Sequence, residues 1–291
     1  MKILLVHGRG QAGKNSAELK GEWFTALERG CAAAGVAMPW TIELVTFPFY
    51  GDLLESLVRD FDAPLSPEIA TRGPGDVDRA YLEFRTDVAE EVRQAAGISD
   101  EEVLAQLPPG APVERGPQNW AWVQAILRAI DSRFPRFSDY LLEQVTRDVW
   151  IYLTAYGVRA RIDELVRDAL DSEPTVVVGH SLGSVITYSV LRQSTSHNVP
   201  RYVTLGSPLG LKTIRQRFRP LAFPPCAADW FNAYDTRDVV ALRGLDRANF
   251  PVDPEIRNKA DVDNHTDDRH GIVGYLEDPV VAREIVTAGA G

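Results

Sequence analysis

Three observations predict an α/β protein, built on a mostly parallel sheet flanked by helices. Short all-apolar runs alternate along the chain with stretches of helical hydrophobic spacing. Glycines end or closely follow the apolar runs at 3–6 and 175–178, as expected for buried strands that lead into tight turns. The length of 291 residues fits one decorated domain or two small ones. Because strands that alternate with helices form parallel sheets, we expect helices on both faces.

The first elements of the chain are expected to begin this sheet. The apolar run at 3–6 predicts its first strand. Helical spacing over 17–34 predicts a helix that ends at Gly35, since glycine is the common residue just past a helix C-terminus. Residues 41–47 are rich in β-formers and predict a second strand, which ends before Pro48.

Residues 50–137 interrupt the alternation of strands and helices. This stretch contains little that resembles a strand, and its helical segments are joined by breaks rich in proline and glycine. We therefore expect a helical insertion, a cap or lid, within a single domain that spans residues 1–291.

The second half of the chain is expected to complete the sheet. Helical periodicity covers 140–170, with an interruption near Gly157. Strands are predicted at 175–178, 201–205 and 230–234, and helices at 182–193 and 280–287.

The charge balance excludes several classes of partner. The chain has 31 Lys and Arg against 41 Asp and Glu, a formal net charge of −10. Nucleic-acid binders carry basic patches, and adhesion to an anionic membrane also needs basic clusters, so neither partner is expected. The apolar N-terminal run is too short for a signal peptide, and no stretch approaches the roughly 18 apolar residues of a membrane span. We expect a cytoplasmic protein without integral membrane association.

A glycine-rich loop follows the first predicted strand. Residues 8–13 match the dinucleotide-binding pattern GxGxxG, and 8–15 nearly match the phosphate-binding pattern GxxxxGK[ST]. However, Asn15 stands where the magnesium-binding hydroxyl would be, and no acidic residue ends the strand at 41–47 to bind a ribose. Nucleotide binding through the Gly8–Gly13 loop therefore stays as the less favoured alternative.

The segment 175–183 carries the most specific motif of the chain. A buried strand leads into Gly179-His180-Ser181-Leu182-Gly183, which has the form G-x-S-x-G, and a helix follows. Such a turn exposes the serine hydroxyl at the end of the sheet, while its glycines relieve crowding. The N–H of Leu182 would then point toward an oxyanion that develops on the substrate.

With this motif the sequence resembles the α/β-hydrolase superfamily, and within it the lipase- and esterase-like serine hydrolases that have a Gly-His-Ser-Leu-Gly nucleophile elbow. The resemblance covers most of the chain outside 50–137. In that superfamily a His-Gly pair after an early strand opens the oxyanion-hole loop, and His7-Gly8 matches it. The resemblance thus implies the N–H of Arg9 as the second oxyanion donor, with Gly10 as the alternative.

The superfamily places its general base last, in the chain order serine, acid, histidine. Three histidines follow Ser181, namely His197, His265 and His270. His197 precedes every credible acid, and His265 sits in a charged run typical of a solvated turn. We favour His270 because it leads into the closing helical region, and His265 stays as the alternative.

The acid is expected in the loop that follows the predicted strand at 230–234. Asp238 precedes Val239 and Val240, which resembles the Asp-x-Val pattern of lipases and esterases. Asp235 is closer to the strand end and is the alternative, although aspartate in that position often caps a turn.

The expected function is that of a serine hydrolase that cleaves carboxylic esters through a Ser181-Asp238-His270 triad and an acyl-enzyme intermediate. The substrate would be a small-molecule or acyl, lipid-like ester, and no cofactor or metal is expected. Amidase or peptidase, thioesterase and acyltransferase activities use the same triad and stay open. A non-catalytic binding protein of this fold is the less favoured alternative of another class.

Overall fold

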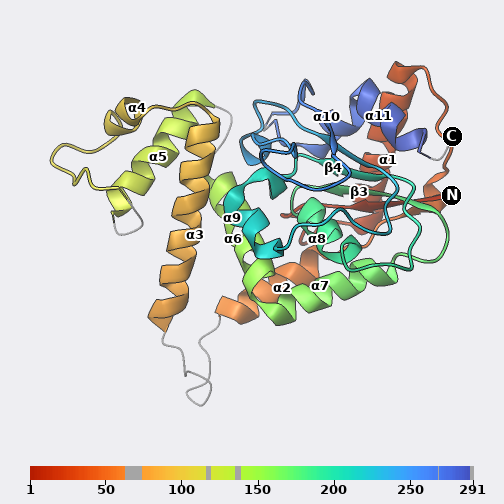
Figure 1. The fold of residues 1–291 in the computed structure, drawn as a ribbon, viewed down its shortest axis with the longest axis horizontal. Coiled ribbons are helices and arrows are strands. Elements are labelled where there is room, and N and C mark those ends of the chain that lie inside the picture. Colours follow the sequence, from red (N-terminus) through yellow and green to blue (C-terminus); the bar gives the residue numbers. More distant parts are fainter. Residues whose placement is uncertain (63–73, 116–118, 135–138, 268, 289–291) are drawn as a thin grey trace, which may run out of the picture.

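The computed structural model describes residues 1–62, 74–115, 119–134, 139–267 and 269–288 of the chain (Figure 1). The predicted insertion at 50–137 is therefore described only in part, since 63–73, 116–118 and 135–137 lie outside these ranges. No helix within the described ranges has the length and apolar character needed to cross a bilayer.

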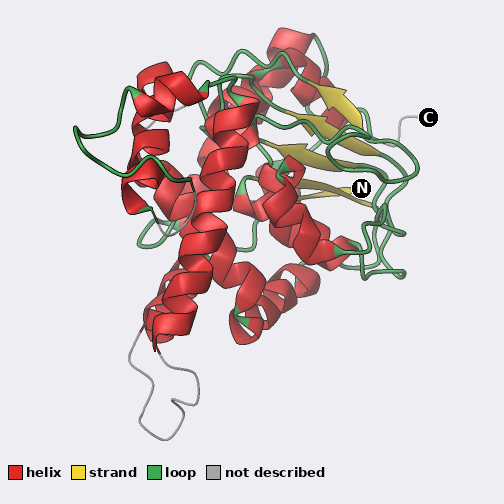
Figure 2. Ribbon diagram, turned by 60° about the vertical axis from the view of Figure 1, so that its left-hand side comes forward, coloured by secondary structure: helices red, strands yellow, loops and turns green. Residues whose placement is uncertain are grey.

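The strands, yellow in Figure 2, form a parallel sheet. Their order in it is β2-β1-β3-β4-β5-β6. All pairs of neighbouring strands are parallel. The strands are β1 (Lys2–Val6), β2 (Val45–Thr46), β3 (Thr175–His180), β4 (Tyr202–Leu205), β5 (Trp230–Ala233) and β6 (Arg257–Lys259). The sheet and its flanking helices confirm the predicted α/β fold class.

Helices cover both faces of this sheet, as the apolar strands at its centre require. They are α1 (Ser16–Ala34), α2 (Gly51–Asp62), α3 (Pro74–Ala95), α4 (Asp100–Leu104), α5 (Trp120–Arg133), α6 (Asp139–Thr154), α7 (Tyr156–Asp168), α8 (Leu182–Leu191), α9 (Lys212–Arg215), α10 (Ile272–Glu277) and α11 (Pro279–Val286). Single 3₁₀ turns occur at Ile42–Leu44, Pro208–Gly210, Gln216–Phe218 and Val239–Ala241.

The strand β1 shows how the two faces are packed. Its side chains alternate between the faces, because successive residues of a strand point in opposite directions. Ile3 and Leu5 belong to the apolar cluster that includes α1, α10 and α11. Leu4 and Val6 belong to the second cluster, which includes α7 and α8.

The stretch 50–137, for which the sequence predicts a helical insertion, contains the helices α2, α3, α4 and α5 in its described part. The helix α2 packs on α7, whereas α3 packs against α5, α6 and α9, and α4 packs against α5. Figure 1 shows α3, α4 and α5 to one side of the sheet. The Glu91 carboxylate on α3 accepts the N–H groups of Lys212 and Thr213 at 2.5 and 2.7 Å, which fastens α3 to the start of α9.

The structure differs from the predicted elements mainly at the two edges of the sheet. The predicted strand at 41–47 is a 3₁₀ turn followed by the two residues of β2. The edge strand β6 was not predicted, because its sequence Arg257-Asn258-Lys259 is polar and largely exposed. The predicted helical stretch at 140–170 divides into α6 and α7 at Ala155, two residues before the expected break.

The strand order brings the glycine-rich loop and the G-x-S-x-G turn together. The chain leaves β1 toward β2 on one side and leaves β3 toward β4 on the other, so the order reverses between β1 and β3. In open α/β sheets such a reversal creates a crevice at the carboxyl ends of the strands, where ligands bind. The loops that follow β1 and β3 both begin at this crevice.

Candidate active site

Ser181 lies on a sharp turn between β3 and α8. Its φ of 54° and ψ of −126° place a non-glycine residue in a sparsely populated region, a conformation that costs about 1–3 kcal/mol and is common at active sites. The Ser181 N–H donates to the Leu205 carbonyl of β4 at 3.0 Å. A Cβ at position 183 would lie 2.2 Å from the Val6 carbonyl oxygen, so only glycine fits there.

The side chains of Ser181, His270 and Asp238 form one hydrogen-bonded chain. Ser181 Oγ lies 2.8 Å from His270 Nε2, and His270 Nδ1 lies 2.7 Å from Asp238 Oδ2. All three residues are buried. In this arrangement the imidazole can accept the serine proton at Nε2 while the carboxylate holds the tautomer and stabilises the imidazolium.

Asp238 is held by further hydrogen bonds at both carboxylate oxygens. Its Oδ1 accepts the Val240 N–H at 3.0 Å, which caps the 3₁₀ turn after β5. Its Oδ2 accepts the Tyr275 hydroxyl at 2.6 Å as well as the His270 ring. Burial raises the pKa of Tyr275 well above its ordinary value, so this hydroxyl stays protonated and donates.

The alternative acid, Asp235, has structural partners. Arg237 pairs with Asp235 Oδ2 at 2.8 Å, and the Asn264 N–H donates to the same oxygen at 2.9 Å. These contacts join the loop after β5 to the segment that leads to His270. The structure therefore places Asp238, and not Asp235, against the His270 ring.

The alternative histidines lie elsewhere. The His265 side chain is 60% exposed, and its Nε2 lies 3.0 Å from a Glu277 carboxylate oxygen. His197 Nδ1 lies 2.5 Å from Ser194 Oγ. Of the three histidines after Ser181, His270 is the one that reaches its hydroxyl.

His180, next to the serine, supports His270 through the backbone. Its Nε2 donates to the His270 carbonyl at 2.8 Å, and the two ring centroids are 4.8 Å apart. Burial lowers the pKa of His180 well below its ordinary value, which keeps the ring neutral. The sequence offered no role for His180, because the second position of G-x-S-x-G is unspecified.

The loop after β1 lies directly over Ser181. A Cβ at position 8 would be 2.9 Å from Ser181 Cβ, so the close approach requires glycine. His7 Nδ1 donates to the Gly8 carbonyl at 2.6 Å, while His7 Nε2 accepts the Tyr50 N–H at 3.1 Å. Only a neutral imidazole can make both bonds, and burial lowers the pKa of His7 to about 4.

The bond from His7 to the Gly8 carbonyl also orients the Arg9 N–H, one of the two predicted oxyanion donors. The Gly8 carbonyl and the Arg9 N–H belong to one planar peptide group, so fixing the carbonyl also fixes the direction of the N–H. The other predicted donor, Leu182, opens α8, where the first N–H groups have no carbonyl one turn earlier. Within the described part of the chain, neither N–H donates to a protein acceptor.

Ser181 and His270 line a cavity of about 350 Å³. Its walls come from the glycine-rich loop, the start of α1, the elbow and the segment around His270. The lining residues are Gly8, Arg9, Gly10, Gln11, Lys14, Leu19, Glu22, Trp23, His180, Ser181, Thr266, His270, Gly271, Ile272 and Val273. Among the described residues, none of α3, α4 or α5 lines it. A cavity of this size is in the usual range for small-molecule sites.

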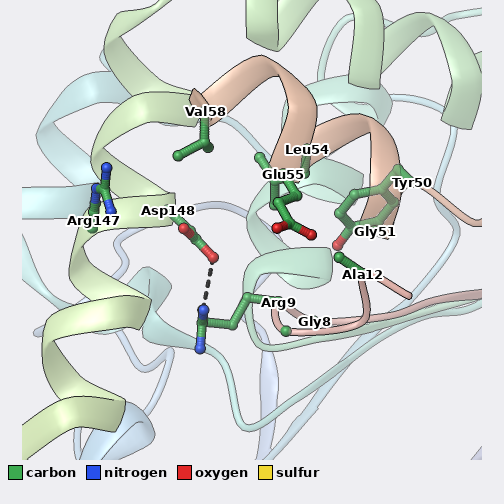
Figure 3. Close-up of a pocket in the computed structure, with 11 residues that line it drawn as sticks. Gly8, Arg9, Ala12, Tyr50, Gly51, Leu54, Glu55, Val58, Arg147 and Asp148 are labelled. Atoms are coloured by element: carbon green, nitrogen blue, oxygen red, sulfur yellow. Dashed lines mark hydrogen bonds and ion pairs between the residues drawn. The ribbon is translucent and has the colours of Figure 1, made fainter. Parts of the chain in front are cut away.

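A second cavity, of about 310 Å³, lies on the other side of the same loop (Figure 3). Gly8, Arg9 and Gly10 line both cavities. The second cavity is bordered by residues of α2 and α6, and the Arg9 side chain extends into it to reach Asp148.

Two N–H groups in the first turn of α1 already have a side-chain partner. The Asn15 side chain accepts the N–H groups of Ala17 and Glu18 at 2.9 and 3.3 Å and so caps the helix. Among the described residues, no group of three or more His, Cys, Asp or Glu side chains is arranged to hold a metal ion.

Comparisons with known proteins do not assign the chain to a family. No protein-family model matches the sequence, and a search of curated proteins finds no match. A functional assignment therefore depends on the geometry of the site and on the residues that compose it.

Sequence reasoning gave no role to Tyr275, and it noted His7 only as part of the His-Gly pair that opens the first loop. Tyr275 lies five positions after His270, and His7 precedes the glycine loop. A tyrosine within two turns of the predicted base and a histidine at a strand end are weak signals, because both are more often structural. Their functions depend on contacts with Asp238 and Gly8, which are distant in sequence or made by the backbone.

Proposed function

We propose that this chain is a serine hydrolase of the α/β-hydrolase type, and that it cleaves carboxylic esters through an acyl-enzyme. The observation that carries the proposal is the hydrogen-bonded chain from Ser181 Oγ through His270 to Asp238. The strained backbone of Ser181 and its place at the reversal of strand order support it.

The reaction begins when Ser181 Oγ attacks the ester carbonyl carbon and His270 Nε2 takes the hydroxyl proton. The carbonyl oxygen becomes an oxyanion, which the N–H groups of Arg9 and Leu182 stabilise; each such donor typically lowers the barrier by about 3 kcal/mol. His270 then gives its proton to the departing alcohol oxygen as the C–O bond breaks. Asp238 stabilises the imidazolium throughout.

Deacylation repeats these steps with water as the nucleophile. His270 Nε2 takes a proton from the water, whose oxygen attacks the acyl carbon. The second oxyanion uses the same donors, and its collapse releases the carboxylic acid as His270 returns the proton to Ser181 Oγ. Over the whole cycle one ester and one water become one alcohol and one carboxylic acid, and the chain's own residues carry the proton transfers.

We favour ester substrates because the elbow resembles those of lipases and esterases. Amides, thioesters and acyl transfer to another acceptor use the same steps, so they are separated by experiment. Nucleotide binding at the first loop is disfavoured, because Asn15 occupies the N–H groups at the start of α1. A binding protein without catalysis would have no need for the strained Ser181 backbone or its contact with His270.

A substrate panel tests the proposal. Wild type and Ser181→Ala are assayed with p-nitrophenyl esters of increasing acyl length, a thioester and a p-nitroanilide. We expect turnover of the esters with the shortest chains favoured by the small cavity, and a loss of at least about 10³-fold in kcat for Ser181→Ala. Cleavage of the anilide without any ester turnover would overturn the ester assignment.

A further inference from the structure

The side chain and backbone of Arg9 have separate partners. Its N–H is the proposed oxyanion donor, whereas its guanidinium extends into the cavity between α2 and α6 (Figure 3). There Arg9 Nε lies 2.7 Å from Asp148 Oδ2 on α6. The two side chains are only 18% and 13% exposed, so water competes weakly for this charge-assisted hydrogen bond.

The backbone around Arg9 needs an external restraint. Arg9 stands between Gly8 and Gly10, and glycine restricts the backbone less than any other residue. An oxyanion donor must nevertheless lie about 2.7–3.1 Å from the developing charge, so small rotations of the loop reduce its effect. Gln11 Nε2 also binds the Arg9 carbonyl, at 2.8 Å, so the residue is held at its carbonyl and at its guanidinium.

Asp148 is held in place because the part of α6 that follows it is packed in the core. The following residues, Val149 and Trp150, belong to the main apolar cluster. The helix α6 packs against α3, α7 and α8, and α8 begins at the elbow. The carboxylate of Asp148 is thus fixed relative to Ser181 through packed helices.

We propose that Asp148 is a positioning residue for the oxyanion hole. Its carboxylate fixes the Arg9 guanidinium, and this contact holds the Gly8–Gly10 loop so that the Arg9 N–H faces the oxyanion. The inference rests on the proposed function and assigns a role to a helix that supplies no member of the triad. In this role Asp148 acts through Arg9 and not through the substrate, so its effect falls on the transition state in which the oxyanion exists.

Four variants and a matched control test this role. Arg9→Ala removes the anchored side chain but keeps the backbone N–H, Asp148→Asn removes the charge of the anchor, and the double variant combines them. Asp148→Glu keeps the charge on a longer side chain. Glu55→Gln is the control: Glu55 lines the same cavity and binds Arg59 at 3.1 Å instead of Arg9. Each kcat is expressed per active site titrated with a fluorophosphonate, so unfolded protein does not count.

We expect Asp148→Asn and Arg9→Ala each to lower kcat about tenfold, with KM within about twofold of wild type. The double variant should be no slower than the slower single variant, since both remove one contact. Asp148→Glu should recover part of the loss, and Glu55→Gln should stay within twofold of wild type.

Two results would overturn the role of Asp148 while leaving the proposed function intact. One is an unchanged kcat for Asp148→Asn in an enzyme that shows Ser181-dependent turnover. The other is a double variant whose loss equals the product of the single losses, which would mean that the two residues act independently. A wild type without Ser181-dependent turnover would instead reject the proposed function, and the role of Asp148 with it.

Discussion

Tyr275 donates its hydroxyl to Asp238 Oδ2 at 2.6 Å, and the same oxygen lies 2.7 Å from His270 Nδ1. The Tyr275 oxygen also accepts the Asp235 N–H at 3.2 Å. One buried phenol on α10, the helix that follows His270, therefore binds the loop after β5 at two points, one of them the acid of the proposed triad. This contact explains how a carboxylate on one loop is held in register with a histidine on another.

Replacing Tyr275 by phenylalanine should affect both catalysis and stability. The ring still fills its site, but Asp238 loses a hydrogen bond that favours its charge, so kcat should fall about tenfold. The buried Asp235 N–H also loses its acceptor, which should lower the free energy of unfolding by about 1–3 kcal/mol. Steady-state kinetics and urea unfolding measure the two effects, and a kcat within twofold of wild type would contradict the role of Tyr275.

The two aspartates after β5 should give opposite phenotypes. Asp238→Asn should lower kcat by about 10³–10⁴-fold, because an amide can hold the His270 ring in the wrong tautomer. Asp235→Asn should mainly lower the thermal midpoint, because Asp235 binds Arg237 and the Asn264 N–H. Kinetics and thermal unfolding on both variants decide this. A larger kcat loss for Asp235→Asn would reverse the assignment of the acid.

The two histidines of the closing segment provide a similar contrast. His270→Ala should lower kcat at least about 10³-fold, since among the described residues His270 is the base in contact with Ser181 Oγ. His265→Ala serves as the matched control and should keep kcat within twofold, because its side chain is 60% exposed and pairs with Glu277. Equal losses in the two variants would show that His270 is not the base.

His7 should make folding stability depend on pH. Burial lowers its folded-state pKa to about 4, whereas the unfolded chain protonates near the ordinary value of 6.5. Between these values the unfolded state binds more protons, so stability is full above about pH 6.5 and falls as the pH drops toward 4. The shift corresponds to about 3 kcal/mol, and His180 acts in the same direction.

The variant His7→Asn isolates this contribution, because an amide keeps a donor near the Gly8 carbonyl but does not titrate in this range. Urea unfolding at pH 7 and pH 4.5 should show a smaller loss of stability in His7→Asn than in wild type. An identical loss in both proteins would mean that His7 does not carry the pH dependence.

The centre of the sheet could be predicted from the sequence because its strands are apolar on both faces. The runs in β1 and β3 are recognisable without a partner, and the turn after β3 has its own motif. The edges could not be predicted in the same way. The two-residue β2 and the polar β6 are strands only because a neighbouring strand offers hydrogen bonds.

The residues of the candidate site also differ in how far the sequence could predict them. Ser181 belongs to a local pattern, and the preference for Asp238 and His270 followed from chain order and short flanking patterns. Tyr275 and Asp148 act through contacts with residues 37 and 139 positions away, which no local pattern encodes. Such contacts arise from how α10 and α6 pack, so the structure is needed to find them.

Covalent labelling with a fluorophosphonate tests whether Ser181 is an activated nucleophile. Folded wild type, Ser181→Ala and His270→Ala are treated with the probe, and intact mass and peptide mapping locate the adduct. We expect one adduct per chain on Ser181, none on that peptide in Ser181→Ala, and labelling at least about 10²-fold slower in His270→Ala. Folded wild type that stays unlabelled at Ser181, or that labels equally fast without His270, would contradict this role of Ser181.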